Sequence, residues 1–312
     1  TPTPRAFHQM TYDSTRQLVV MFGGQSGVLT TAEDEFPQAS WLNDTWTFNG
    51  DVWQQVNASI SLDSSGGYDI AFDANRNVTV LIGRSQESEG NNRFAKMWEF
   101  DESGWHKATV NEEIPAQLFP LLVIDPHQKD LFLFSGFQLS EIWQYDGQAW
   151  SHSPSQVPPL MRGSLIAKVV YFEQLEAFVF TNLTGGTEKF TPFQEERWSF
   201  LPSREENNGG RFWFDMVYDT ARGVIVLFGG QRQARPAGSL QLEVIQTLND
   251  TWEFDGEVWY EVSPRQVPPA RYGHAMAYDE ARGVVVLFGG IAADGTYLND
   301  TWEYNGLTWT QK

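Results

Sequence analysis

The chain has 312 residues, of which 41% are apolar and 14% aromatic, enough for one large domain with a sizeable core. Its 40 acidic and 21 basic residues give a net charge of −19, which argues against binding to nucleic acids or to anionic membrane surfaces. The absence of cysteine excludes disulfides, thiolate catalysis and cysteine-ligated metals. No apolar run is long enough for a membrane helix, so we expect no membrane insertion.

Six units follow one another along the chain, and five of them contain two tryptophans seven residues apart. These pairs are Trp46/Trp53, Trp98/Trp105, Trp143/Trp150, Trp252/Trp259 and Trp302/Trp309. We take Trp198 as the first tryptophan of the remaining unit, with Glu205 at the second position. Successive first tryptophans then lie 52, 45, 55, 54 and 50 residues apart, a spacing that is typical of repeat architectures.

A turn signal separates the two tryptophans in four units, and it predicts a hairpin. The dipeptides are Asn49-Gly50, Asp146-Gly147, Asp255-Gly256 and Asn305-Gly306. Such dipeptides favour two-residue hairpin loops, because both positions need positive φ. We therefore expect Trp46 to lie opposite Trp53 as a cross-strand pair. In the second unit we expect a longer turn, residues 101–104.

Another hairpin precedes each of these. The sequence HQMTYDSTRQLVVMFGG ends at Gly24, and close copies end at Gly230 and Gly290. An alternating strand leads into a Tyr-Asp-x-x-Arg turn, and a valine-rich strand that reads as buried on both faces follows. Each unit thus holds four antiparallel strands, and no stretch shows helical periodicity. The prediction is an all-β protein of six four-stranded sheets, a β-propeller with aromatic pairs between its blades.

The Gly-Gly that ends the second strand and the tryptophan on the fourth resemble the kelch motif over residues 5–310. The resemblance is strong in units one, five and six and poor in unit four. It implies a six-bladed kelch-type propeller in one domain, 1–312, with blades at about 1–57, 58–110, 111–155, 156–203, 204–263 and 264–312. It also implies that the first strands line a central channel, and the candidate channel-lining residues are Arg5, His8, Arg271 and His274. We expect a monomer.

The phrase Leu-Asn-Asp-Thr-Trp occurs three times and contains a glycosylation sequon at Asn43, Asn249 and Asn299. Its identical place in each repeat favours strand-entry chemistry over glycosylation. Its aspartates are Asp44, Asp250 and Asp300. The blades that carry them also begin with an arginine, namely Arg5, Arg211 or Arg271. We therefore predict a structural ion pair in each of these blades rather than a metal site.

Long, unequal loops between the second and third strands, together with the linkers between blades, point to the channel mouth as the functional region. Arginine forks and aromatic planes there suit sugars or carboxylates. The candidate ligand-binding residues are Arg84, Arg93, Arg211, Trp213, Arg232, Arg235 and Tyr272. We predict a ligand-binding or protein-interaction propeller that takes a glycan, a peptide or an acidic small ligand, or a protein partner, at this mouth.

Metal and cofactor signals are few. His8 and His274 occupy equivalent positions, three residues after an arginine, and this equivalence favours a structural role. The loop residues Glu33, Asp34 and Glu35 offer oxygen ligands for Ca²⁺, but their spacing matches no calcium-loop pattern, so a solvated loop is the favoured interpretation. No cofactor is predicted.

Two alternative functions remain open. Some kelch propellers are sugar mutarotases or epimerases, and Arg5, His8 and Arg271 could supply the reacting groups of such an enzyme. The copper oxidases of this family use a cysteine-crosslinked tyrosine, which a chain without cysteine cannot form. The second alternative is a structural domain of a larger extracellular protein. We expect an extracellular or periplasmic location.

Overall fold

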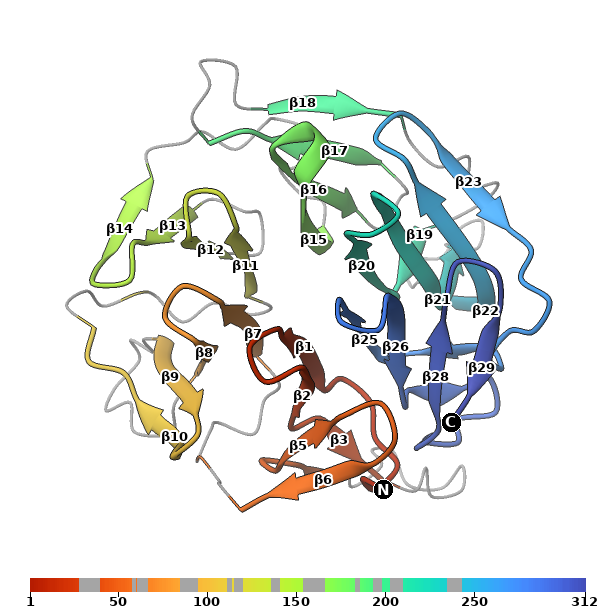
Figure 1. The fold of residues 1–312 in the computed structure, drawn as a ribbon. Helices are drawn as coiled ribbons and strands as arrows, with labels where there is room; N and C mark the ends of the chain where they lie inside the picture. Colours follow the sequence, from red (N-terminus) through yellow and green to blue (C-terminus); the bar gives the residue numbers. More distant parts are fainter. Residues whose placement is uncertain are drawn as a thin grey trace. The chain divides into compact units, whose positions relative to one another are not determined.

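The computed structural model describes residues 1–27, 40–57, 60, 67–84, 95–110, 114, 120–135, 141–153, 166–182, 186–192, 198–202, 210–234 and 243–312. The protein is an all-β, six-bladed β-propeller with four antiparallel strands in each blade, which confirms the predicted fold class (Figure 1). Within these residues the only helix is the short 3-10 turn η1 (Glu173–Leu175), and none is long and apolar enough to cross a membrane.

The chain divides into two compact units, and the first consists of Thr1–Pro2, Gln9–Gly24 and Trp41–Ser164. It holds blades one to three, in which consecutive strands of each blade pair antiparallel. The strands are β1 (Gln9–Asp13), β2 (Leu18–Phe22), β5 (Thr45–Phe48) and β6 (Trp53–Val56); β7 (Tyr68–Asp73), β8 (Val78–Arg84), β9 (Ala95–Asp101) and β10 (Gly104–Lys107); and β11 (Leu121–Asp125), β12 (Asp130–Ser135), β13 (Glu141–Tyr145) and β14 (Trp150–Ser153). The first strands are neighbours, because β7 contacts both β1 and β11.

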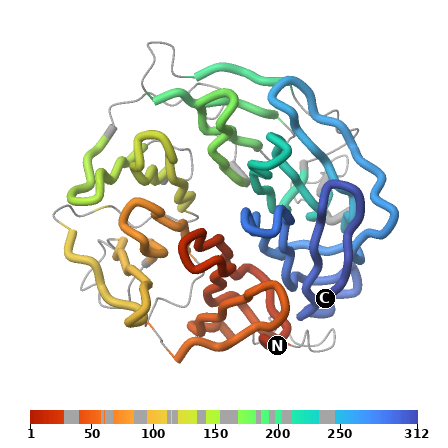
Figure 2. The backbone as a smooth tube through the Cα atoms, viewed as in Figure 1, coloured from red at the N-terminus to blue at the C-terminus, as the bar shows by residue number. Residues whose placement is uncertain are grey.

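The second unit consists of Thr3–His8, Gln25–Ser40 and Leu165–Lys312 and holds blades four to six. Figure 2 follows the chain through these blades from green to blue. The blade strands are β15 (Ile166–Phe172), β16 (Ala177–Asn182), β17 (Thr187–Phe190) and β18 (Trp198–Leu201); β20 (Asp215–Asp219), β21 (Val224–Ala234), β22 (Glu243–Phe254) and β23 (Trp259–Val262); and β25 (Ala275–Asp279), β26 (Val284–Phe288), β28 (Thr301–Tyr304) and β29 (Trp309–Gln311). The first strands β15, β20 and β25 contact one another in that order.

In the described part of the chain, five further short strands lie outside the four-stranded pattern. They are β3 (Gln25–Ser26), β4 (Ser40–Trp41), β19 (Gly210–Phe212), β24 (Arg271–Tyr272) and β27 (Ile291–Ala292). Strand β19 pairs with the part of β21 that extends beyond Gly230, and β24 pairs with β27. These short pairs hold the chain segments that enter blades five and six.

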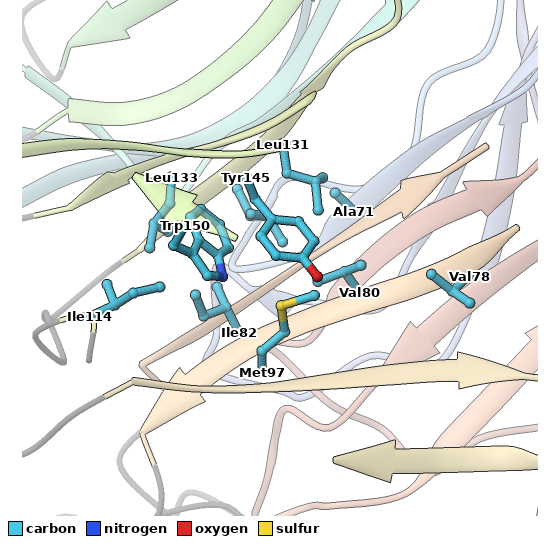
Figure 3. Close-up of a cluster of buried hydrophobic side chains, with 11 residues drawn as sticks. Ala71, Val78, Val80, Ile82, Met97, Ile114, Leu131, Leu133, Tyr145 and Trp150 are labelled. Carbon is cyan, nitrogen blue, oxygen red and sulfur yellow. The ribbon is translucent and has the colours of Figure 1, made fainter. Parts of the chain in front are cut away.

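Within each unit the core lies between neighbouring blades, where aromatic side chains of one blade pack on the valine-rich strand of the preceding blade. In Figure 3, Trp150 and Tyr145 of blade three lie among side chains of blade two that include Met97. In the second unit, Trp309 of blade six packs in the same way against Phe228 of blade five. Burial of one tryptophan removes about 150–250 Å² from water, or about 4–6 kcal/mol as a gross upper bound.

The hairpin between the third and fourth strands is longer than predicted. Phe48 pairs with Trp53, so four residues form the turn between them. The side-chain oxygen of Asn49 accepts hydrogen bonds from the backbone N–H groups two and three residues later, both 3.0 Å long, and this Asx turn replaces the two-residue loop. Trp46 therefore lies opposite Gln55, and the predicted pairing of Trp46 with Trp53 is wrong. The other pairs in this register are Phe100/Trp105, Tyr145/Trp150, Phe254/Trp259 and Tyr304/Trp309.

The turn predicted for the second unit, residues 101–104, is confirmed, but it is no longer than the turns of the other blades. Phe100 pairs with Trp105, so four residues lie between them as in the other blades, and an additional Asp101–Gly104 pair continues the ladder into the turn. The side-chain oxygen of Asp101 accepts the backbone N–H of Ser103 at 2.7 Å, which is the same kind of Asx turn.

Trp198 also differs from the prediction. It lies on the fourth strand of its blade and pairs with Phe190, just as Trp259 pairs with Phe254 in blade five. Trp198 is therefore the second tryptophan of its unit, and the predicted assignment as the first is wrong. Glu188, two residues before Phe190, stands where the other blades have their first tryptophan.

The side chains of the repeated Asn-Asp-Thr-Trp phrase form structural hydrogen bonds. The indole nitrogen Nε1 of Trp46 donates a hydrogen bond to Asp44 Oδ2 at 2.7 Å. The hydroxyl of Thr45, which is fully buried, accepts a hydrogen bond from Trp105 Nε1 of the next blade at 2.7 Å. These contacts agree with the strand-entry interpretation of the phrase.

Candidate functional site

Three equivalent segments, here called the entry segments, lead toward the first strands of blades one, five and six. They are Arg5-Ala6-Phe7-His8, Arg211-Phe212-Trp213-Phe214 and Arg271-Tyr272-Gly273-His274, and all belong to the second unit. Each is held by a short ladder to residues that follow a Gly-Gly pair: Ala6 bridges to Gln25, β19 pairs with β21, and β24 pairs with β27. The candidate site is built from these segments.

The Gly-Gly pairs are required by the close approach of the entry segments. A Cβ atom on Gly230 would lie 2.7 Å from the carbonyl oxygen of Phe212, and one on Gly229 would lie 2.8 Å from that of Arg271. Both glycines also have positive φ, of 93° and 58°. The repeated glycines therefore position the entry segments rather than bind a ligand.

The first residue of each entry segment is a fully buried arginine. Arg211 donates to both carboxylate oxygens of Asp250, at 2.7 and 2.6 Å, and to the carbonyl of Gly229 at 2.9 Å. Arg271 binds Asp300 in the same way, at 2.6 and 2.8 Å. The predicted ion pairs are confirmed in blades five and six.

Arg5 anchors the N-terminal entry segment to blade six. Its backbone N–H donates to the carbonyl of Leu298 at 3.0 Å, and its own carbonyl accepts from Gly290 at 2.8 Å. Its guanidinium donates to the carbonyl and hydroxyl oxygens of Thr3, at 3.2 and 3.1 Å. The third predicted ion pair, between Arg5 and Asp44, stays a prediction.

The third residue of each entry segment has a left-handed backbone. Its φ is 58° at Phe7, 55° at Trp213 and 64° at Gly273. This conformation is costly for a residue with a side chain, and such strain is concentrated at functional sites. The three residues are also joined in series, because Phe7 N–H donates to the Gly273 carbonyl at 2.7 Å and Gly273 N–H donates to the Trp213 carbonyl at 2.8 Å.

Phe7, Trp213 and Tyr272 form what we call the aromatic cluster. The ring centroids of Trp213 and Tyr272 are 5.5 Å apart, and those of Phe7 lie 6.0 Å from Trp213 and 6.4 Å from Tyr272. Trp213 remains 45% exposed, although a large aromatic side chain normally contributes its area to the core. The cluster therefore holds a partly exposed indole in contact with two other rings.

A pair of uncharged polar side chains adjoins this cluster. The Tyr297 hydroxyl donates a hydrogen bond to Gln25 Oε1 at 3.3 Å. Gln25 is bonded through its backbone to Ala6, next to Phe7, at 3.0 and 2.7 Å. Tyr297 bridges to Ile291, whose other partner is Tyr272. Gln25 and Tyr297 form what we call the polar pair.

The last residues of two entry segments are the buried histidines His8 and His274. His274 packs edge-on against Phe228, with centroids 5.5 Å apart, and His8 packs equivalently against Phe288 at 5.6 Å. Burial, with smaller effects of the Arg271, His8 and Lys168 charges, holds the pKa of His274 well below its ordinary value, so this imidazole is neutral at pH 7. The repeated geometry agrees with the structural interpretation of both histidines.

The other predicted binding residues are placed as follows. Arg232 lies on β21 opposite Arg211, is partly buried, and its Nε has no hydrogen-bond acceptor. Arg84 is the last residue of β8, in the first unit, and its side chain lies outside the described residues. Arg93, Arg235 and the calcium candidates Glu33, Asp34 and Glu35 also lie outside them. Among the residues that the structure does describe, no three metal-binding side chains gather.

Phe7, Gln25 and Tyr297 are not among the site residues predicted from the sequence. A signal for Phe7 was present, since the three entry segments align Phe7 and Trp213 with Gly273, and glycine commonly marks a left-handed position. No local pattern marked the polar pair, because Gln25 and Tyr297 come from opposite ends of the chain.

Comparison with known proteins identifies the fold. No protein-family model and no curated protein matches the chain. The solved structure of YjhT is 12% identical to this chain and has a TM-score of 0.69. The match covers 100% of this chain and 98% of YjhT. A mutant of the Aleuria aurantia lectin in complex with Fucα1-6GlcNAc is 9% identical, with coverages of 100% and 96% and a TM-score of 0.61. A copper-bound fungal alcohol oxidase is 14% identical, with coverages of 97% and 62% and a TM-score of 0.55.

Proposed function

We propose that this propeller is a carbohydrate-binding module whose ligand stacks on the exposed indole of Trp213. The observation that carries the proposal is a tryptophan that is 45% exposed, held in a left-handed backbone and packed against Phe7 and Tyr272. A rigid, partly exposed aromatic plane beside uncharged hydrogen-bonding groups suits the apolar face and the hydroxyls of a sugar.

The geometry favours stacking on an outer face over enclosure in an aromatic cage. A cation-binding cage needs space between its rings, with the cation within about 6 Å of each centroid. Here the rings contact one another at centroid separations of 5.5 to 6.4 Å, so they fill the space between them. The surface left for a ligand is the exposed part of Trp213.

Lectins among the structural neighbours support this proposal. Two of them are forms of a fucose-specific lectin, which shows that a propeller of this size can serve as a sugar-binding scaffold. We further propose that the chain is a kelch-type propeller that acts as a monomer in an extracellular or periplasmic location.

A binding function is favoured over a sugar-converting enzyme. The residues that the enzyme alternative assigns to the reaction are Arg5, His8 and Arg271, and they are only 0%, 2% and 0% exposed. Groups buried to this extent do not reach a ligand at the surface. Anomer exchange measured by NMR on any saccharide that binds tests the alternative directly, and acceleration by the protein would favour the enzyme.

A glycan array followed by calorimetry tests the proposal. We expect the wild-type chain to bind a defined set of glycans and Trp213→Ala to bind them about tenfold more weakly or worse, as for an aromatic hot spot. Phe200→Ala is the matched control, because Phe200 is an aromatic residue that is 63% exposed elsewhere in the second unit. Binding by Trp213→Ala equal to that of the wild type, or no glycan binding at all, would contradict the proposal.

A further inference from the structure

The arginines of the entry segments are not available to a ligand. Arg5, Arg211 and Arg271 are each 0% exposed. Both terminal nitrogens of Arg211 and of Arg271 donate to a carboxylate, and one of them also donates to a carbonyl. A bidentate fork that is already bonded to aspartate has no further place for the carboxylate of a ligand. The three positive charges nearest in sequence to the aromatic cluster are therefore neutralised or enclosed.

The pKa values of Tyr272, which contacts Trp213, and of Tyr297, which lies near Tyr272, reflect the charges around them. Burial alone raises the pKa of Tyr272, and burial together with the Tyr272 phenol raises that of Tyr297. Within the described part of the chain, no cationic side chain lowers either value. By contrast, Arg222 opposes the effects of burial and Glu253 on the pKa of Tyr260. The surroundings of Tyr272 and Tyr297 therefore disfavour negative charge.

The polar groups close to the cluster are uncharged. Gln25 uses its Oε1 to accept from Tyr297, and within the described residues its amide nitrogen donates to no other group. Gln231, which pairs with Phe212 next to Trp213, is also uncharged, but it is only 7% exposed. The amide of Gln25 and the hydroxyl of Tyr297 match the hydroxyl groups of a sugar, which both donate and accept.

From these observations we infer that the ligand of the Trp213 site is an uncharged saccharide, stacked on Trp213 with hydroxyls bound by the polar pair of Gln25 and Tyr297. This inference rests on the proposed carbohydrate-binding function and narrows it to neutral sugars. It replaces the acidic ligand that the arginine-rich loops suggested from sequence. A uronic acid, which carries a carboxylate at C6, would lose water from that charge without gaining a cationic partner.

The test compares sugars that differ only at C6. Calorimetry would measure binding of the methyl pyranosides of glucose, galactose and mannose and of the three matching uronides. Work in 0.5 M NaCl reduces the Debye length to about 4 Å, so that the net charge of the chain does not decide the result. We expect at least one neutral sugar to bind and its uronide to bind at least tenfold more weakly.

Variants assign the preference to the named residues. Tyr297→Phe and Gln25→Ala each remove groups that bind hydroxyls, so each should weaken neutral-sugar binding about three- to tenfold. The matched controls Tyr260→Phe and Gln54→Ala change the same residue types elsewhere and should leave affinity unchanged. An unchanged affinity in both Tyr297→Phe and Gln25→Ala would overturn the assignment to the polar pair.

Arg232, with its unbonded Nε, is the described cation that could instead select an acidic sugar. Uronides that bind as tightly as the neutral sugars, and lose affinity in Arg232→Gln, would overturn the inference while the proposed function stands. Failure of every neutral and acidic saccharide to bind would overturn both.

Discussion

The indole nitrogen of Trp309 donates a hydrogen bond to the hydroxyl of Thr251, 3.0 Å away, and joins the fourth strand of blade six to the third strand of blade five. Trp259 makes the same bond to Thr187 of blade four at 2.9 Å. The threonine of the repeated Asn-Asp-Thr-Trp phrase therefore accepts a hydrogen bond from a tryptophan of the next blade, whereas the aspartate accepts one from the tryptophan of its own blade. This division of roles explains why the phrase recurs as a block.

Replacement of Thr251 by valine should destabilise the protein by about 1–3 kcal/mol. The substitution preserves the side-chain shape and removes the acceptor, so that the buried Trp309 Nε1 is left without a partner. Denaturant unfolding of wild type and Thr251→Val measures the loss. Thr310→Val is the control at an exposed position and should change stability by less than about 0.5 kcal/mol.

The contact between blades two and three lacks this bond, and a substitution can supply it. Trp150 is 2% exposed and its Nε1 has no acceptor, because Met97 stands where blades one, four and five have threonine (Figure 3). Met97→Thr supplies a hydroxyl that can accept the bond, which should stabilise the protein, but it also removes buried apolar volume, which should destabilise it. A double-mutant cycle with Trp150→Phe isolates the bond, and we expect a favourable coupling of about 1 kcal/mol. A coupling near zero would show that the hydroxyl does not reach Nε1.

The Arg271–Asp300 ion pair should make stability depend on pH at the acid end. Burial raises the pKa of Asp300, but the hydrogen bonds and charge of Arg271 outweigh it and hold the pKa below the ordinary 3.8. A lowered folded pKa gives a contribution that is present above pH 3.8 and is lost as the pH falls through the folded value. Asp300→Asn should cost about 3 kcal/mol at pH 7, because it leaves Arg271 buried without a counter-charge.

The difference between wild type and Asp300→Asn should therefore shrink as the pH is lowered below 3.8 in urea unfolding experiments. Asp294→Asn is the control, because Asp294 lies in an exposed turn and its acceptor role toward Thr296 is retained by asparagine. A constant difference between wild type and Asp300→Asn across the pH range would exclude the ion pair as its source.

The fold could be predicted because its signals are periodic and its core is aromatic. The spacing of tryptophans and the valine-rich strands before Gly-Gly define the blades without any knowledge of long-range contacts. The strand register could not be predicted in this way. Asn49 can favour either a two-residue turn or a longer Asx turn, and only the two hydrogen bonds to its side chain decide between them.

The candidate site was predicted only in part. Trp213 and Tyr272 were selected because aromatic residues follow the entry arginines, and the structure places them in contact at 5.5 Å. Arg211 was also predicted to bind the ligand. Its ion pair with Asp250 was predicted separately, because the blades that carry this aspartate also begin with an arginine. The polar pair joins residues 272 positions apart, and no local sequence pattern reports such a contact.

Glu188 should lower the stability of the native state at neutral pH. Its carboxylate stands where other blades have a tryptophan, is 4% exposed, and burial raises its pKa above the ordinary 4.5. With a raised folded pKa, the unfolded chain ionises first, so stability falls as the pH rises from 4.5 through the folded value. Glu188→Gln should therefore be more stable than wild type at pH 7 and equally stable below pH 4.5. Thermal melts of both proteins across this range would show it; a less stable variant at pH 7 would contradict it.

Substitutions at Gly273 and Gly283 distinguish the effect of backbone strain from the effect of a displaced Phe7 ring. Its φ is 64°, and a Cβ there would lie 2.9 Å from the ring of Phe7. Gly283 has the same φ, but its nearest neighbour would be the Tyr278 hydroxyl at 3.9 Å. Alanine should cost about 1–2 kcal/mol at either position, because both backbones are left-handed.

Only Gly273→Ala should also displace Phe7 and weaken saccharide binding at Trp213. Tryptophan fluorescence and calorimetry on the two variants measure these effects beside their stabilities. Equal saccharide affinity in Gly273→Ala and Gly283→Ala would show that Phe7 does not support the indole of Trp213. A selective loss in Gly273→Ala would show that the N-terminal entry segment is part of the binding site, because Phe7 is its only contribution to the aromatic cluster.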